Sequence, residues 1–260
     1  MDSLRQQWAD GKSTLGGWLA IPDTVTAEAA TRCGFDYVCV DMQHGLADYH
    51  HMVGMVQAIE LAGGVPIARA PWNEPGVIGR ILDAGAHGIV VPMVNSPAEA
   101  EAVVRSCRYA PLGSRSVGPI VAGMRRSGYP EWAAATIATI PMIESVEAVA
   151  RIDDILAVPG IDAVYVGPAD LSVSLGLPPG NNDDRSEFTE ALLTIVAACT
   201  RAGVVPGIHA TGALAARRLE QGFRMITVAG DLLAMRTKMA EEIAIARGAQ
   251  QGASTDRSIY

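Results

Sequence analysis

The chain has 260 residues, of which 49% are hydrophobic, and a formal net charge of −8 at pH 7. This length exceeds that of one small sandwich and is typical of a single large α/β barrel. The negative charge, with no run of lysine and arginine longer than a pair, argues against binding to nucleic acid or an anionic membrane. A polar N-terminal segment and the lack of a membrane-length apolar run predict a cytoplasmic protein without a signal peptide. We expect the four widely spaced cysteines to be reduced core residues: Cys33, Cys39, Cys107 and Cys199.

Apolar runs and amphipathic segments alternate along the chain, which is the pattern of repeated strand–helix units. The predicted strands, in chain order, are Leu15–Ala20, Tyr37–Val40, Val65–Ala68, Gly88–Pro92, Ile137–Ile143, Ala163–Gly167, Val205–His209 and Met225–Ala229. The helices predicted after them are Thr24–Cys33, Asp48–Ala62, Glu74–Ala84, Pro97–Arg108, Val146–Val158, Glu187–Ala202, Ala213–Gln221 and Leu232–Arg247.

The units predict one (β/α)₈ TIM-barrel domain over residues 1–247, followed by a flexible C-terminal tail over residues 248–260. The strands lack polar alternation, as expected for a parallel sheet covered by helices. An open doubly wound sheet is the alternative architecture. It normally carries a GxGxxG turn after its first strand, and none follows the first strand here.

Two connections are longer than the others. Leu175–Ser186 follows the sixth strand at the barrel mouth, where it is placed to act as a lid. Tyr109–Ala135 follows a helix and therefore starts at the opposite end of the barrel. It either folds back or reaches a neighbouring subunit. Its arginines either serve an anionic ligand or form ion pairs in a solvated loop.

Acidic side chains follow two neighbouring predicted strands. Glu144 ends the run TIATIPMIE, and Asp170 follows the run VYVGPA. Both carboxylates are therefore expected at the barrel mouth, where this fold places its chemistry. With waters and a chelating substrate completing the shell, they predict a site for Mg²⁺, Mn²⁺ or Co²⁺. The alternative is a pair of mouth acids neutralised by Arg69.

Three further polar residues are candidates for chemistry. His44 follows the second strand in VCVDMQHG, so its imidazole can act as a general base at the mouth. Arg69 ends the third strand and either pairs with Asp41 or Glu144, or holds a substrate carboxylate or an oxyanion. Asp83 ends a helix, where it is a capping or surface acid unless it reaches and orients His44.

Other residues at the strand tips complete the predicted pocket. The amide groups after Gly167 form a small cradle for a carboxylate. Trp18 either walls the pocket or belongs to the core, and His209 is a weaker candidate at the end of the seventh strand. The only lysines, Lys12 and Lys238, lie away from every strand tip, which argues against a Schiff-base mechanism.

Five segments, taken together and in order, resemble the HpcH/HpaI family of class II pyruvate aldolases, within the phosphoenolpyruvate/pyruvate barrel superfamily. They are GFDYVCVDMQHG, RAPWNEPGVIGRILDAGAHGIVVPMV, RYAPLGSRSVG, PMIES and VGPADLSVSLG, and the resemblance covers residues 14–247. It implies a metal-dependent lyase that cleaves a 4-hydroxy-2-oxo acid, such as 4-hydroxy-2-oxoheptanedioate or a 2-keto-3-deoxy sugar acid. The products are pyruvate, released through a metal-bound enolate, and an aldehyde. It further implies a hexamer that exchanges its last helix and serves aromatic-compound or sugar-acid catabolism.

The resemblance also implies a role for each matching residue. His44 is the base, Asp83 its paired acid, and Arg69 the group that stabilises the enolate oxygen. Glu144 and Asp170 are the metal ligands. The substrate-binding positions are Trp18, Arg69, Tyr165, Gly167, Ala169 and Asp170.

Two positions depart from the family pattern. Met142 stands where many members have glutamine, and Gln43 stands where many have glutamate before the catalytic histidine. Both changes bear on substrate choice more than on reaction class. The alternatives are a citrate-synthase-like or acyl-CoA lyase, in which Arg125 and Arg126 would bind coenzyme A at the rim, and a barrel without catalytic activity.

Overall fold

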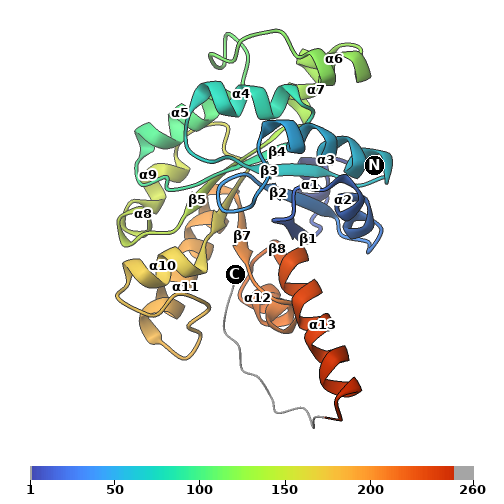
Figure 1. Ribbon diagram of the computed structural model, residues 1–260. Helices are drawn as coiled ribbons and strands as arrows, with labels where there is room; N and C mark the ends of the chain where they lie inside the picture. Colours follow the sequence, from blue (N-terminus) through green and yellow to red (C-terminus); the bar gives the residue numbers. More distant parts are fainter. Residues whose placement is uncertain (1, 249–260) are drawn as a thin grey trace.

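The computed structural model describes residues 2–248, so residues 249–260 of the predicted tail lie outside the described chain. Eight parallel strands close into one barrel in sequence order, with β1 paired to both β2 and β8 (Figure 1). The predicted TIM barrel is therefore confirmed. The strands are β1 (Thr14–Leu19), β2 (Tyr37–Asp41), β3 (Pro66–Arg69), β4 (Gly88–Val91), β5 (Ala138–Ile143), β6 (Ala163–Val166), β7 (Val205–His209) and β8 (Met225–Gly230).

Helices surround the barrel on the outside. They are α1 (Leu4–Ala9), α2 (Thr24–Thr31), α3 (Tyr49–Leu61), α4 (Pro75–Asp83), α5 (Pro97–Cys107), α6 (Ile120–Arg125), α7 (Tyr129–Thr136), α8 (Val146–Ala150), α9 (Ile152–Leu156), α10 (Pro168–Ser174), α11 (Ser186–Ala202), the 3₁₀ helix η1 (Gly212–Leu214), α12 (Ala215–Glu220) and α13 (Asp231–Ala246). The side chains of Asp23, Asp48, Ser96 and Ser145 each accept a backbone N–H and so cap the N-termini of their helices.

Some local predictions need correction. The single helix expected over Val146–Val158 is divided at Arg151 into α8 and α9. The short helices α1, α6, α7 and α10 were not predicted, because each has eight residues or fewer and too little periodicity to detect. Three of the four cysteines are buried free thiols, but Cys33 is exposed, contrary to expectation.

Strand residues alternate between two apolar layers. Val38 and Val40 of β2 face the helices, whereas Tyr37 and Cys39 face the barrel interior. Gly16 makes room for the Tyr37 ring, because a Cβ on that glycine would lie 2.0 Å from the ring. Bulky inward side chains thus fill the barrel and leave its mouth as the place for a binding pocket.

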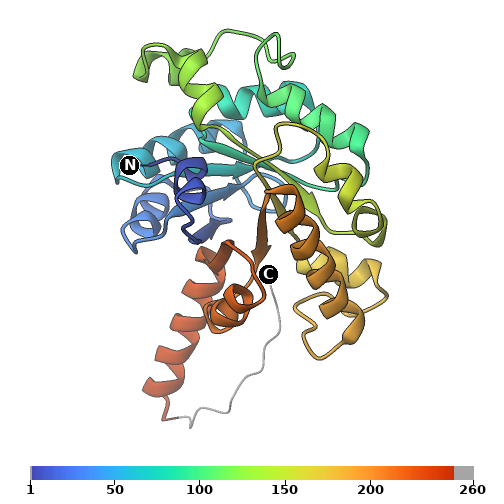
Figure 2. The same cartoon turned by 180° about the vertical axis from the view of Figure 1, so that it is seen from behind.

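The segment 109–135 lies over the outside of the barrel near α4, far from α13, as Figures 1 and 2 show. Its arginines form ion pairs with acidic residues, which was one of the two predicted alternatives. Arg115 pairs with Asp83 at 2.6 Å, and Arg125 and Arg126 both pair with Glu60 of α3. These pairs attach the segment to its own barrel.

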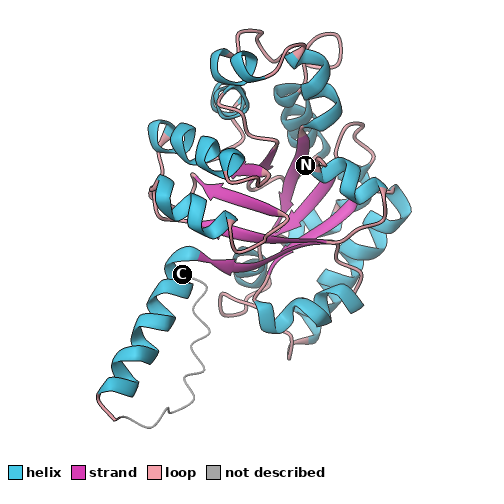
Figure 3. Cartoon of the chain, turned by 90° about the vertical axis from the view of Figure 1, so that its right-hand side faces the viewer, coloured by secondary structure: helices cyan, strands magenta, loops and turns pink. Residues whose placement is uncertain are grey.

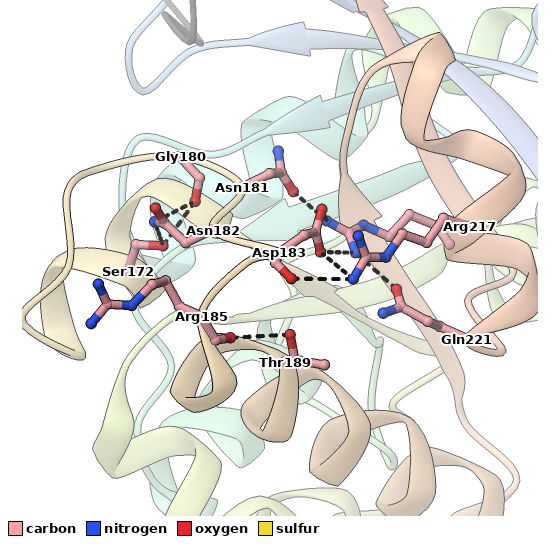
Figure 4. Close-up of polar contacts among 10 residues, drawn as sticks. Ser172, Gly180, Asn181, Asn182, Asp183, Arg185, Thr189, Arg217 and Gln221 are labelled. Atoms are coloured by element: carbon pink, nitrogen blue, oxygen red, sulfur yellow. Dashed lines mark hydrogen bonds and ion pairs between the residues drawn. The ribbon is translucent and has the colours of Figure 1, made fainter.

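The connection after α10, predicted as a lid, is fastened to α12 (Figure 4). The fully buried Arg218 donates to both carboxylate oxygens of Asp183, at 2.7 and 2.9 Å, and to Asn181 at 2.8 Å. The neighbouring Asn182 donates to Ser172 of α10 at 2.8 Å. A buried, hydrogen-bonded charge thus holds the loop and, through it, the helix that follows β6.

The last helix, α13, extends away from the barrel (Figures 1 and 3). Asp231 anchors its start by accepting the N–H groups of Ala20 and Ile21, at 2.9 and 3.0 Å. No side chain of α13 is buried, and several large apolar ones are exposed: Leu232, Met235, Met239, Ile243 and Ile245. Within residues 2–248, no helix combines the length and apolar character needed to cross a membrane.

Candidate active site at the barrel mouth

A pocket lies at the carboxyl ends of the strands, where the sequence places its candidate residues. Trp18, Arg69, Glu144, Tyr165, Gly167, Ala169 and Asp170 all line it, together with Met142, Pro168 and His209. All the predicted substrate and metal positions therefore meet in one cavity. The two remaining predicted residues, His44 and Asp83, are not among its lining residues.

Asp41 at the end of β2 organises one wall of the pocket. Arg69 donates to both of its carboxylate oxygens, at 2.8 and 2.5 Å, and Trp18 donates its indole N–H at 3.2 Å. Burial raises the pKa of Asp41, but these hydrogen bonds and the Arg69 charge outweigh it, so the pKa is lowered. Of the alternatives for Arg69, the pairing with Asp41 is present. It fixes the guanidinium without removing it from the pocket.

Glu144 at the end of β5 is held deep in the opposite wall. It is 3% exposed, and its Oε1 accepts the backbone N–H of Met93 at 2.7 Å. Burial, reinforced by the charge of Asp170, raises the pKa of Glu144 to about 7 despite that hydrogen bond. The pocket thus lacks the positive charge that would fully stabilise the Glu144 carboxylate.

The backbone that holds Glu144 is itself strained and supported. Met93 has φ of 55°, a left-handed conformation that is uncommon for a residue with a side chain. Asn95 donates to the Met93 carbonyl at 3.2 Å and accepts a hydrogen bond from Ser145, the residue after Glu144. A closed circuit of hydrogen bonds therefore joins the loops after β4 and β5 and aims one N–H at the buried carboxylate.

Gly167 and the start of α10 form the floor beside Glu144. A Cβ on Gly167 would lie 2.3 Å from Oε2 of Glu144, so any larger residue here would displace that carboxylate. Pro168 begins the helix, and Asp170 in its first turn reaches the pocket from an exposed position. Gly167, Pro168 and Ala169 at this helix start line the same pocket as the two carboxylates.

These residues suit a divalent cation. Glu144 and Asp170 carry hard oxygen ligands and line the same pocket. The pKa of Glu144 is raised mainly by burial and further by the charge of Asp170, and a bound cation would stabilise the ionised carboxylate. Among residues 2–248 no cluster of three or more His, Cys, Asp or Glu is arranged to hold a metal. Two carboxylates therefore leave most of the coordination shell to water and substrate.

His44 and Asp83 lie at opposite ends of the barrel. His44 follows β2 at the mouth, is exposed, and donates its backbone N–H to Asp41 at 3.3 Å. Asp83 ends α4, which runs from the mouth back toward the start of β4. Its carboxylate accepts a hydrogen bond from Arg115 at 2.6 Å, outside the mouth pocket. Within one barrel, the fold therefore separates the two members of the predicted pair.

The family model described as HpcH/HpaI aldolase/citrate lyase matches residues 15–237. The hydroxypyruvate/pyruvate aldolase of Rhizorhabdus wittichii is 40% identical over 95% of this chain and 99% of its own length. The chain belongs to this family. It is accordingly an aldolase, a lyase that acts on carbon–carbon bonds, and the predicted resemblance is confirmed.

Solved structures agree with this assignment. The family protein from Burkholderia cenocepacia J2315 is 34% identical, with a TM-score of 0.88, and the match covers 95% of this chain and all of that one. The structure of citrate synthase SbnG is 30% identical, with a TM-score of 0.85, and covers 95% of this chain and 98% of that one. One family fold therefore serves enzymes named for different carbon–carbon chemistry.

Several site residues were missed or undervalued by sequence reasoning. Asp41 carried a signal, since a carboxylate that ends a buried strand needs a partner. His209 was rated weak, yet it lines the pocket. Met93 carried no signal, because methionine does not mark a left-handed turn. Asn95 carried none either, because its support of the Met93 carbonyl is a tertiary contact.

Proposed function

We propose that this aldolase reversibly cleaves a 4-hydroxy-2-oxo acid into pyruvate and an aldehyde, with a divalent cation at Glu144 and Asp170. The observation that carries the proposal is the convergence of these two carboxylates with the buried guanidinium of Arg69 on one pocket. When bound, Mg²⁺, Mn²⁺ or Co²⁺ would polarise the 2-oxo group and stabilise negative charge on its oxygen.

The proposed roles of the other pocket residues follow from their positions around the two carboxylates. The amides of Ala169 and Asp170 bind the substrate carboxylate at the start of α10. The C3–C4 bond breaks and leaves an enolate, whose oxygen is stabilised by Arg69, oriented beforehand by Asp41. Trp18 and Tyr165 wall the pocket and exclude water from the enolate.

We propose His44 as the base that takes the C4-hydroxyl proton, directly or through one water. It is exposed at the mouth, on the side from which an aldehyde would leave. An orienting carboxylate from Asp83 would have to come from a second copy of the chain, because α4 carries Asp83 away from its own mouth. The proposed dyad and the proposed oligomer therefore depend on each other.

A hexamer with exchanged last helices is consistent with α13. Apolar side chains such as Met239, Ile243 and Ile245 are exposed along a helix that leaves its own barrel. Exposed apolar patches of this kind favour association. We further propose a cytoplasmic location, which suits the three buried free thiols. Size-exclusion chromatography with light scattering, on the full chain and on one truncated before Leu232, tests the assembly.

Proton exchange at the pyruvate methyl group in D₂O tests the proposed chemistry without an aldehyde. Exchange should require added metal, stop with chelator, and fall at least a hundredfold in Glu144→Gln. Glu147→Gln, on the exposed surface of α8, is the matched control and should exchange normally. Mn²⁺ binding measured by titration should be lost in the first variant and kept in the second. Exchange that persists in chelator would refute the metal site.

A citrate-synthase-like reaction is the second candidate, because citrate synthase SbnG shares the fold at 30% identity. The predicted rim arginines do not favour it here. Arg125 and Arg126 pair with Glu60 near the end of α3, away from the mouth. Comparing acetyl-CoA with pyruvate as the enolate donor separates the two reactions, and turnover with acetyl-CoA alone would favour this candidate.

A further inference from the structure

A chain of buried hydroxyl groups beneath the pocket determines which ring nitrogen of His209 carries hydrogen. Tyr165 donates its only hydroxyl proton to Thr227 Oγ1 at 2.6 Å. Its oxygen lies 3.3 Å from Nδ1 of His209, so in that contact the oxygen must accept. Nδ1 of His209 therefore bears the proton. In the neutral ring, Nε2 is then a hydrogen-bond acceptor.

The surroundings keep this ring neutral. Burial, reinforced by the positive charge of Arg69, lowers the pKa of His209 to about 4. Trp18 contacts the ring edge-on, with 5.2 Å between ring centroids. A neutral imidazole of fixed tautomer therefore lines the pocket at neutral pH.

The two nitrogens point to nearly opposite sides of an imidazole ring. Nδ1 of His209 is engaged by Tyr165, which is 1% exposed and lies in the barrel interior. His209 itself is only partly buried and lines the mouth pocket. The half of the ring that carries Nε2 is therefore the half directed away from the interior, toward the mouth pocket.

We infer that Nε2 of His209 accepts a hydrogen bond from a hydroxyl group on C3 of the enolate donor, so that the enzyme favours 3-hydroxy-2-oxo acids over pyruvate. This rests on the proposed function, in which Ala169 and Asp170 hold the carboxylate and Arg69 faces the 2-oxo oxygen. The remaining arm of the substrate is C3. Among the remaining pocket side chains, Trp18 and Met142 present apolar surface to C3, and the Tyr165 hydroxyl donates its proton to Thr227. His209 is then the remaining side chain that offers a hydrogen-bond acceptor to a group on C3.

The chemistry of a bare acceptor explains the selectivity. The lone pair of a neutral Nε2 repels a carboxylate on C3 of the donor. The methyl group of pyruvate would displace water from Nε2 without providing a hydrogen bond. A hydroxyl group provides that bond. Leaving a buried acceptor unsatisfied commonly costs about tenfold or more in specificity. We expect hydroxypyruvate to exceed pyruvate as donor by about tenfold in kcat/KM with one common aldehyde.

Three substitutions test whether the donor preference depends on the hydrogen-bond acceptor at the Nε2 position or on the imidazole ring as a whole. In His209→Asn the amide can still donate to Tyr165 but does not reach the Nε2 position, so the preference for hydroxypyruvate should fall about tenfold. In His209→Gln a carbonyl oxygen reaches that position, so the preference should be retained. Glu147→Gln, on the exposed surface of α8 and outside the pocket, is the control and should leave the ratio unchanged. C3-proton exchange of each donor in D₂O and the KM of each donor are the readouts.

The outcomes distinguish this inference from the proposed function. Metal-dependent exchange of both donors, with a ratio in His209→Asn within twofold of that in the native enzyme, would overturn the role of His209 alone. A native enzyme that does not favour hydroxypyruvate would overturn it equally. Native enzyme that exchanges neither donor, or does so in chelator, would instead refute the metal-dependent aldolase site. If His209→Asn does not fold, His209→Phe provides the same loss of acceptor with the ring retained.

Discussion

The buried charge of Arg218 supplies a sharp test of how the loop after α10 is held. The side chain is fully buried and makes four hydrogen bonds, two to Asp183, one to Asn181 and one to Gln221. Replacement by methionine removes the cation but leaves Asp183 largely buried without its main partner. Breaking a buried pair from one side costs about 3–5 kcal/mol. For a chain of this size, we expect Tm to fall by roughly 10 °C.

Arg217 provides a control on the same helix with the same acidic partner. Its side chain is 46% exposed and lies 3.7 Å from Asp183, so Arg217→Met should change stability by less than about 1 kcal/mol. Urea denaturation and calorimetry of Arg218→Met, Arg217→Met and the double variant Arg218→Met/Asp183→Leu measure these effects. The double variant should lose less than the sum of its single changes. An Arg218→Met loss no larger than that of Arg217→Met would refute the reasoning.

Three other predictions follow from single contacts. In Gly167→Ala the new Cβ meets Oε2 of Glu144 at 2.3 Å, so proton exchange should fall about a hundredfold, while Gly118→Ala, with open space around it, should leave it unchanged. Asn95→Ala removes the support of the strained turn that aims an N–H at Glu144 and should weaken Mn²⁺ binding about tenfold in titrations. The pKa of Glu60 is lowered to about 2, because hydrogen bonds from a histidine and an arginine outweigh its burial. Its ionised form therefore stabilises the fold above pH 4.5 and loses that contribution as pH falls toward 2; Glu60→Gln should cost about 2 kcal/mol in urea denaturation at pH 7 and little near pH 2.5.

The order and bounds of the strands could be predicted from sequence because they depend on local apolar pattern. All eight predicted strands agree with β1–β8 to within one residue at each end. Parallel strands buried on both faces are continuous apolar runs, and caps such as Asp23 and Ser96 mark the helices between them. Short helices depend on packing against the barrel instead, so α1 and α10 were invisible at this level.

The site could be predicted only as a set of candidates. A barrel brings the tips of all its strands to one end, which is why Glu144, Asp170 and Arg69 could be grouped before any contact was known. The hydrogen-bond partner of each side chain could not be predicted in the same way. Arg69 had three possible anionic partners, and the structure selects Asp41 at 2.5 Å from the register between β2 and β3.

The sequence by itself determined the eightfold repeat and the acidic, lysine-free strand tips, because both depend only on residues that are close together along the chain. Only the tertiary structure decided that Asp83 and His44 lie at opposite ends of one barrel, and that Arg218 holds a loop 35 residues away in sequence through Asp183. It also decided that His209 shares a buried hydroxyl chain with Tyr165. Such pairings depend on how far each strand is staggered around the closed barrel, and no local pattern of residues encodes that distance.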